Sequence, residues 1–121
     1  MQRKNRLSRS RDFDAVYRHG RSVSTRYLVL YSFARPAGDD TAGAEPRLGL
    51  AVPKAVGGAV VRNRVKRQLK EIWRGRLDQV QAGRDYVIVV RPGLPDAAEA
   101  RGHEWLVGRV DEVLRKAGAP A

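Results

Sequence analysis

The sequence contains no cysteine, so disulfide bonds and thiolate metal sites are excluded. It also has no uninterrupted apolar run close to the roughly 20 residues that a membrane-spanning helix needs. The basic first residues are not followed by the apolar segment of a secretory signal. A protein of this kind fits a reducing compartment, and we expect it in the cytoplasm.

Histidine is almost as scarce, since only His19 and His103 are present. Nucleophilic sites of the Ser–His–Asp type need a histidine beside a carboxylate, and the sequence indicates no such grouping. The carboxylates are scattered along the sequence. Asp39 and Asp40 are adjacent in a loop, but a hard cation needs more oxygen ligands than this pair supplies. We therefore predict neither catalytic residues nor a metal site in the protein itself.

Acidic residues are few where basic residues are dense. The formal net charge is +11, and it lies in two blocks. Residues 1–35 hold nine Arg or Lys against two Asp, residues 54–76 hold eight against one Glu, and the rest is slightly acidic. A surface made basic only for solubility would mix both signs. The segregated blocks indicate a nucleic acid or an anionic membrane as the partner.

The length of 121 residues and the hydrophobic content of 42% predict one domain, residues 1–121, with a single core. Three segments lack helical or strand periodicity. We interpret them as a flexible basic arm over 1–9, a hairpin loop over 36–46 and a tail over 118–121.

Helices are predicted over residues 10–19, 59–77 and 96–117 from apolar spacing. In the first of these, Phe13, Val16 and Tyr17 share one face. The other two carry longer apolar stripes, so each should cover part of a sheet.

Strands are predicted over 23–34, 47–53 and 86–91. The first is partly apolar on both faces and should be central, and the third is a β-branched run typical of a strand covered on both faces. Because a helix joins the last two strands, they should be parallel. The fold class is therefore α+β: a small mixed sheet of about four strands packed against helices. We expect the order helix, two or three strands, helix, strand, helix.

The predicted helix over 59–77 is the most informative part of the chain. Its buried face is predicted to comprise Val61, Val65, Leu69, Ile72 and Trp73, which fall within an arc of roughly 120°. The next arc holds the side chains of Arg62, Lys66, Lys70, Asn63, Arg74 and Arg67, with Arg64 beyond them beside Glu71. With one acid among so many cations, the positive side chains of this helix repel one another. Bound phosphates would remove that repulsion.

Two further features of this segment suit a polyanion. Arginine presents a planar fork to phosphate oxygens, and Asn63 adds donors and an acceptor. Gly57 and Gly58 either let the backbone approach a phosphate at the helix N-terminus or only make the turn. A membrane is the weaker alternative, because the apolar face of the helix is already needed for the core.

The pattern Gly-x-Ala-Val-x-Arg-Asn-Arg-x-Lys-Arg resembles the signature of the bacterial ribonuclease P protein component. Residues similar to the family occur over about 5–115. They include Arg6-Leu7, Asp12-Phe13, Tyr17-Arg18-His19-Gly20, Val29-Leu30-Tyr31, Arg47-Leu48-Gly49-Leu50-Ala51-Val52 and Tyr86-Val87-Ile88.

In that family a large RNA cleaves precursor tRNA to make the mature 5′ end. This ribonucleoprotein is an endoribonuclease, that is, a hydrolase, and it acts in tRNA processing. The resemblance implies that this chain is its protein subunit and that the RNA carries out the chemistry. The implied partners are ribonuclease P RNA and precursor tRNA, with no membrane and no obligate protein partner. Mg²⁺ would be held mainly by the RNA subunit and substrate, without an organic cofactor.

The resemblance also implies two binding sites and an unusual connection. The catalytic RNA would contact Arg62, Asn63, Arg64, Lys66, Arg67 and Lys70. A cleft between the first helix and the sheet would hold the single-stranded 5′ leader, using Phe13, Tyr17, Tyr31 and Lys54. Aromatic rings beside cations suit single strands, although each ring could instead be ordinary core. The strand–helix–strand crossover would be left-handed, against a preference of about 98% for right-handed ones.

Some positions differ from the family pattern. Lys54 is followed by Ala55, where members often have a second base, and Gly58 stands where many have a polar residue. Lys70 keeps the charge of a frequent arginine without its fork. A general RNA-binding module would explain the charge but not the aromatic cleft, and a sequence-specific DNA-binding protein would use the basic helix in a major groove.

Overall fold

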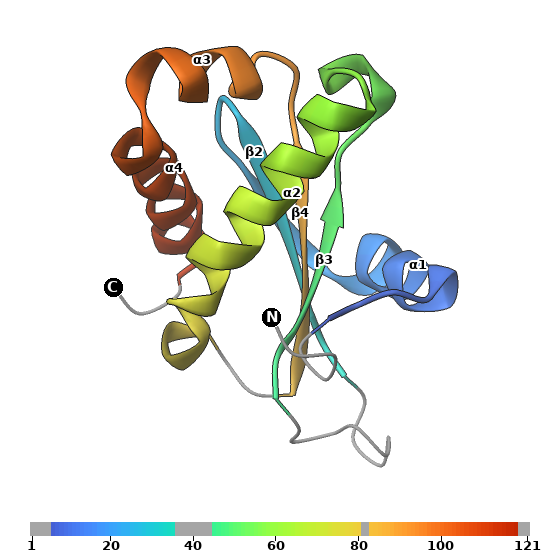
Figure 1. The fold of residues 1–121 in the computed structure, drawn as a ribbon. Coiled ribbons are helices and arrows are strands. Elements are labelled where there is room, and N and C mark those ends of the chain that lie inside the picture. Colours follow the sequence, from blue (N-terminus) through green and yellow to red (C-terminus); the bar gives the residue numbers. More distant parts are fainter. Residues whose placement is uncertain (1–5, 36–44, 81–82, 119–121) are drawn as a thin grey trace.

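The computed structural model describes residues 6–35, 45–80 and 83–118 (Figure 1). They form one mixed sheet with helices on both faces, which confirms the predicted α+β class. Its elements are α1 (Ser10–His19), β1 (Arg21–Ser24), β2 (Leu28–Ala34), β3 (Arg47–Ala51), the 3-10 turn η2 (Lys54–Val56), α2 (Ala59–Arg74), the 3-10 turn η3 (Leu77–Gln79), β4 (Arg84–Val90), α3 (Leu94–Arg101) and α4 (His103–Lys116). None of the helices in these ranges has the length and apolar character that crossing a bilayer requires.

The sheet has the strand order β1-β2-β4-β3. β3 and β4 pair in parallel, as their helical connection predicts, and the other two pairs are antiparallel. β2 and β4 are the two inner strands, and β4 is covered on both faces. The predictions of a central strand and of a doubly covered strand are therefore both confirmed.

The prediction of one continuous strand over 23–34 is wrong, because the chain turns back between β1 and β2. The Thr25 backbone N–H donates to the Leu28 carbonyl at 2.8 Å. The Leu28 N–H in turn donates to the Thr25 hydroxyl at 3.3 Å. These bonds close a tight turn of the kind that Ser and Thr favour, and they convert one long strand into a hairpin.

The loop over 36–46 does not join a hairpin, contrary to the prediction. β4 lies between β2 and β3, so the two strands that the loop connects are not neighbours. The apolar β4 lies between them, where both of its faces can be buried. This burial outweighs the tendency of two strands joined by a loop to pair with each other. Residues 36–44 of this loop lie outside the described residues.

The predicted flexible arm is wrong at its C-terminal end. The Leu7 side chain is 3% exposed, and its N–H donates to the Leu48 carbonyl at 2.8 Å beside β3. Residues 1–5 of the arm and 119–121 of the predicted tail lie outside the described residues.

Helix boundaries also differ from the predictions. The predicted helix over 96–117 is two helices, because Gly102 has a φ of +94° and breaks the helical path between α3 and α4. α2 starts at Ala59 as predicted but ends at Arg74, three residues early, and the chain continues into η3.

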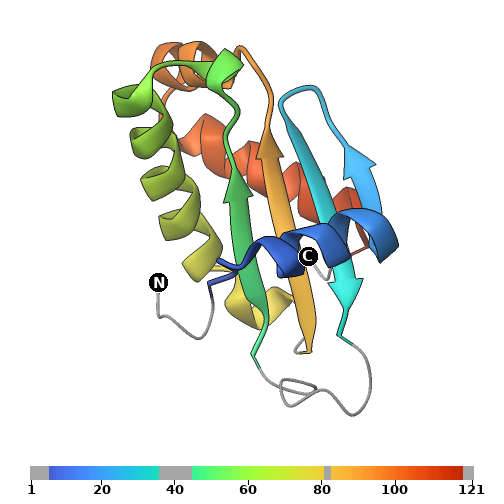
Figure 2. The same cartoon turned by 90° about the vertical axis from the view of Figure 1, so that its right-hand side faces the viewer.

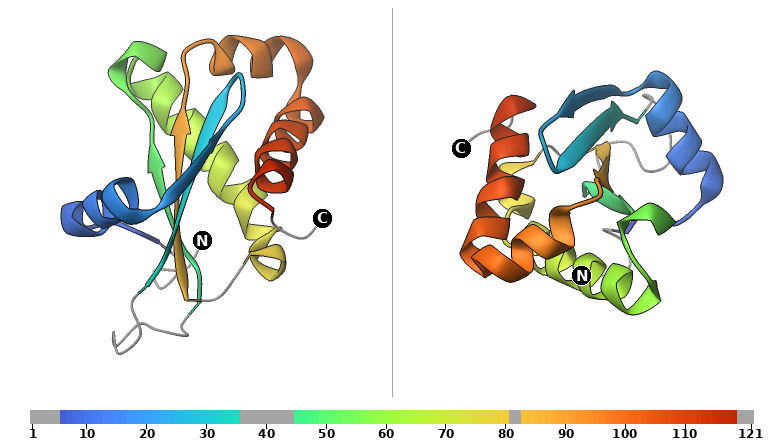
Figure 3. Two further views of the ribbon diagram at one scale, coloured as in Figure 1. Left: turned by 180° about the vertical axis from the view of Figure 1, so that it is seen from behind. Right: turned by 90° about the horizontal axis from the view of Figure 1, so that it is seen from above.

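Two apolar clusters hold the helices on opposite faces of the sheet. α2 and α4 pack on one face, and α1 crosses the other (Figures 2 and 3). The predicted buried side of α2 is confirmed: four of its five members are buried and Val61 packs against them. Seen from the α1 side with β3 and β4 pointing up, β4 lies to the right of β3, so it lies to the left when seen from the side of α2 (Figure 2). The crossover is thus left-handed, as the resemblance implies.

Candidate nucleic-acid interface

The N-terminus of α2 depends on a glycine that makes room for a valine. A Cβ at Gly57 would lie 2.9 Å from Cγ1 of Val61, which is too close for an unmoved side chain. A Cβ at Gly58, the N-cap, would meet open space. Gly57 is therefore needed for packing, whereas Gly58 leaves the helix start uncovered.

The cationic side chains of α2 occupy two flanks of the helix. Arg62 and Lys66 lie next to the buried side and are half-buried, and the Arg62 Nε donates to the Gly57 carbonyl at 3.1 Å. Continuing around the helix come Lys70, Asn63 and Arg67. Five of the six predicted RNA-binding residues thus share one surface, which we call the α2 surface: Arg62, Asn63, Lys66, Arg67 and Lys70.

Arg64 lies apart from the α2 surface. It lines a small recess with Gln68 on α2 and with Pro95 and Glu99 on α3. The structure therefore separates one predicted RNA-binding residue from the other five, because a step of two residues along a helix rotates a side chain by about 200°.

The charge of α2 is almost unbalanced. Glu71 is its single acid and pairs with Arg74. In the part of the chain that the structure describes, no ion pair joins a carboxylate to any cation of the α2 surface or to Arg64. The Val60 side chain beside them is 80% exposed and offers an apolar surface to a ligand. Sequence periodicity did not single it out. The surface can offer several charge-assisted hydrogen bonds to phosphates.

The other predicted site lies where α1 crosses the sheet (Figure 2). The Phe13 ring rests on Gly49 of β3, where a Cβ would come within 2.5 Å of the ring's Cζ. The ring also packs on the small cluster of Leu7, Val16 and Val87. Phe13 therefore attaches α1 to the sheet, and the glycine of the Leu-Gly-Leu strand is the sequence signal for it.

Tyr17 and Tyr31 make the exposed aromatic part of this site. Their ring centroids are 4.9 Å apart in an edge-to-face arrangement, and Tyr17 is 39% exposed. Burial, and secondarily Tyr31, raise the pKa of Tyr17 above its ordinary value. The phenol therefore stays neutral at physiological pH and does not repel a polyanion.

Small aliphatic side chains continue the site along the sheet. The register places Val29, Val89 and Ala51 in one row across β2, β4 and β3, next to the row that contains Tyr31. All three are half-buried, and α1 does not cross this end of the sheet (Figure 2). We call this area, with Tyr17 and Tyr31, the α1 cleft. Its floor depends on strand register, so sequence reasoning missed it.

Lys54 lies beyond the end of β3. It is exposed in η2, and Ala55 beside it is exposed as well. Among the contacts of the described residues, none joins Lys54 to the three predicted aromatic residues. The structure therefore brings Phe13, Tyr17 and Tyr31 together and places the predicted cation outside that group, beyond the end of β3.

A buried ion cluster fixes α1 against β3 and β4. The Asp85 carboxylate, 3% exposed, accepts from Arg35 Nη1 at 2.6 Å and from Arg47 Nε and Nη2 at 2.8 Å each. Arg47 also lies 3.7 Å from the Asp12 carboxylate in the first turn of α1. No local sequence pattern predicts this cluster, since its members are up to 73 positions apart.

The two histidines lie on different helices, α1 and α4. His19 packs near Phe33 and His103 is exposed at the start of α4. Among the described residues, no three side chains of the His, Cys, Asp or Glu type converge as metal ligands would. The Asp39–Asp40 pair lies outside these residues.

Comparison with known proteins gives consistent relatives. The Ribonuclease P family model matches residues 1–117. The ribonuclease P protein component of Acidothermus cellulolyticus is 45% identical over 109 residues, covering 90% of this chain and 84% of that protein. The component from Geobacillus sp. strain WCH70 is 34% identical over 121 residues, covering 98% and 95%.

Solved structures show the same architecture. The RNase P protein from Thermotoga maritima superimposes with a TM-score of 0.77 at 28% identity, covering 92% of this chain and 96% of that one. The Staphylococcus aureus RNase P protein gives 0.77 at 26% identity, covering 93% and 94%. Sequence and fold agree, and the chain belongs to the ribonuclease P protein family, the RNA-binding component of a tRNA-processing ribonucleoprotein.

Proposed function

We propose that this chain binds the catalytic RNA of ribonuclease P and the 5′ leader of precursor tRNA, and so assists endonucleolytic removal of the leader. The observation that carries the proposal is the presence of two surfaces with different chemistry. The α2 surface offers cations that have no carboxylate partner among the described residues, and the α1 cleft offers aromatic and aliphatic side chains on the opposite face of the sheet.

The α2 surface suits a structured RNA. Its arginines can grip phosphates through two parallel hydrogen bonds, and its lysines act as point charges. Neutralising phosphates also releases the counterions condensed on the RNA, which makes binding salt-dependent. Arg64, on the other flank of α2, would contact a neighbouring segment of the same RNA.

The α1 cleft suits a single strand. Tyr17 offers an exposed ring on which a base can stack, and Tyr31 supports that ring from the side. The aliphatic row beside them accepts bases of any identity, because it offers contact area without hydrogen-bond readout. Lys54, exposed beyond the end of β3, can hold a leader phosphate, and Phe13 keeps α1 at the correct distance from the sheet.

The chemistry in this proposal belongs to the RNA. Mg²⁺ takes phosphate and water oxygens readily, so the RNA and the substrate would hold it and use it for cleavage. The protein's own residues would raise substrate affinity and neutralise phosphates near the cleavage site. The proposal places the protein in the cytoplasm with two RNA partners and requires no second protein.

Reconstitution with a bacterial ribonuclease P RNA tests the proposal. We expect the protein to permit cleavage of precursor tRNA at a low Mg²⁺ concentration where the RNA alone cleaves poorly. Binding should favour precursor tRNA over mature tRNA, which lacks the leader. Absence of both effects would contradict the proposal. Equal affinity for the two substrates would instead indicate a general RNA-binding module, and a strong preference for one DNA duplex would indicate a DNA-binding protein.

A further inference from the structure

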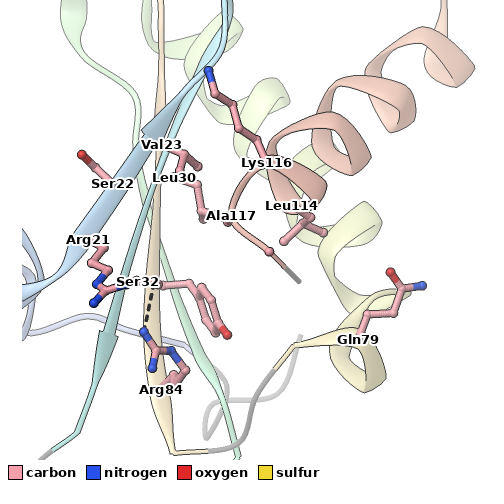
Figure 4. Close-up of a pocket in the computed structure, with 12 residues that line it drawn as sticks. Arg21, Ser22, Val23, Leu30, Ser32, Gln79, Arg84, Leu114, Lys116 and Ala117 are labelled. Carbon is pink, nitrogen blue, oxygen red and sulfur yellow. Dashed lines mark hydrogen bonds between the residues drawn. The ribbon is translucent and has the colours of Figure 1, made fainter. Parts of the chain in front are cut away.

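A recess lined by basic side chains lies on the α4 face of the sheet, beside the C-terminal end of α4 (Figure 4). Its volume is about 410 Å³, and β1, β2, β4, η3 and α4 contribute to its walls. That volume falls in the usual range of small-molecule sites, about 300–1,000 Å³. The described residues that line it include Arg21, Arg84 and Lys116 and no carboxylate.

Strand pairing places hydrogen-bonding side chains in a row across this recess. Arg21 of β1 is opposite Ser32 of β2, and Ser32 is opposite Tyr86 of β4. Arg84 Nη2 donates to the Ser32 hydroxyl at 3.1 Å. Figure 4 shows both arginine side chains extending toward Ser32. Two guanidinium groups therefore approach one hydroxyl from different strands.

The charge of the recess differs from that of the buried cluster on the other face. There, Asp85 pairs with its arginines, whereas none of the described residues that line the recess is acidic. Lys116 is already engaged at the rim, since its Nζ donates to the Ser24 carbonyl at 2.6 Å. The partial negative charge at the C-terminus of α4 is offset by two basic residues in its last turn. An anion with several acceptor oxygens would relieve the remaining positive charge.

An apolar wall stands beside the two arginines. Half-buried Val23 and exposed Ala117 line the recess above the buried Leu30 and Leu114, and Gln79 of η3 adds an amide. A bare inorganic anion would make no use of this wall. A ligand with a phosphate next to a sugar or a base would fill both parts.

We propose that this recess binds a nucleotide phosphate, with Arg21 and Arg84 on the phosphate and the sugar or base against Val23 and Ala117. The nucleotide can belong to an RNA strand or be free. The recess lies on the sheet face opposite α1 and away from the cationic flank of α2, so it would be a third site. It does not depend on the function proposed for the other two surfaces.

Backbone amide NMR spectra of the full chain test this proposal. Titration with AMP, and separately with a six-nucleotide single-stranded RNA, should shift the amide signals of Arg21, Ser32 and Tyr86. Because each charge-assisted fork is lost with its side chain, Arg21→Ala and Arg84→Ala should each weaken AMP binding by at least about tenfold. Arg115→Ala is the matched control, since it removes an exposed cation of α4 that does not line the recess.

The ligand series separates the two sources. Shifts at the recess with both ligands assign it to an RNA strand, and shifts with AMP alone assign it to a free nucleotide. Failure of both ligands to shift these signals would overturn the proposal, as would an equal loss of affinity in Arg115→Ala, which would mean general charge attraction. Arg84→Lys keeps the charge without the fork, so it provides a second test if Arg84→Ala does not fold.

Discussion

The two faces of this protein use arginine in opposite ways. On the α1 face, Arg35 and Arg47 share one buried carboxylate of Asp85. On α2, five cations of the proposed RNA-binding set have no carboxylate partner among the described residues, and only Glu71 interrupts the positive charge. The buried arginines of the α1 face therefore hold a helix in place, whereas the cations of α2 remain available for a ligand.

This difference explains how a small domain can present the two surfaces proposed above, one for phosphates and one for bases. A cleft that stacks bases needs rings held at fixed positions, and a buried ion cluster together with Phe13 on Gly49 supplies that rigidity. A surface that binds phosphates needs charge more than fixed geometry, because long cationic side chains can adapt to the phosphate positions. Changes on the two faces should therefore affect different measurements.

The largest effect is expected from breaking the buried cluster. Asp85→Asn removes the negative charge of a carboxylate that is 3% exposed and that binds both Arg35 and Arg47. The free energy of unfolding should fall by about 3–5 kcal/mol, the usual cost of breaking a buried pair. Urea denaturation followed by circular dichroism would measure it. Asp14→Asn, an exposed change on α1, is the control, and equal stability of the two variants would show that the cluster is not structural.

Removing the exposed ring of the α1 cleft should come next. Tyr17→Ala should weaken binding of precursor tRNA to the holoenzyme by about 1–3 kcal/mol, because one stacked base loses its platform. Affinity for mature tRNA and for the RNA subunit should not change. Tyr17→Phe keeps the ring and should bind like the unaltered protein. A loss of folding in Tyr17→Ala would instead mean that the ring is part of the core.

A change on the α2 surface should give the reverse pattern. Arg62→Ala should lower the slope of log affinity for the RNA subunit against log salt by about one unit, since one phosphate contact is lost. The preference for substrates with a leader should be kept. Arg115→Ala, which removes an exposed cation from α4, should leave the slope unchanged. If Arg62→Ala shows the same slope as the unaltered protein, this arginine does not contact a phosphate.

The smallest effect is expected from a partly exposed pair on neither surface. Arg76 donates to both oxygens of Asp111 at 2.8 and 2.9 Å, and this hydrogen bonding lowers the pKa of Asp111 below its ordinary value. The stabilisation is therefore present at neutral pH and is lost as the pH falls through the lowered pKa. Asp111→Asn should cost about 0.2–1 kcal/mol at pH 7. Thermal unfolding at pH 7 and in acid would measure it, and the two proteins should converge in acid.

Local pattern was a good guide to α2 and to β4. The 3.6-residue spacing of Val65, Leu69 and Ile72 places them on one side of any helix, so the position of the cations on the exposed sides follows without tertiary information. The run of β-branched residues in β4 likewise requires cover on both faces. The same reasoning failed where one or two residues reverse the chain, at Thr25 and at Gly102.

The family, the α+β class and the cationic helix could thus be read from the chain alone, because periodicity, charge and motif spacing are local properties. Strand order, the aliphatic row of the α1 cleft, the Asp85 cluster and the recess beside α4 came only with the tertiary structure. Each of them joins residues far apart in sequence. Which of those residues meet is decided by which strand buries the most apolar surface at the centre of the sheet.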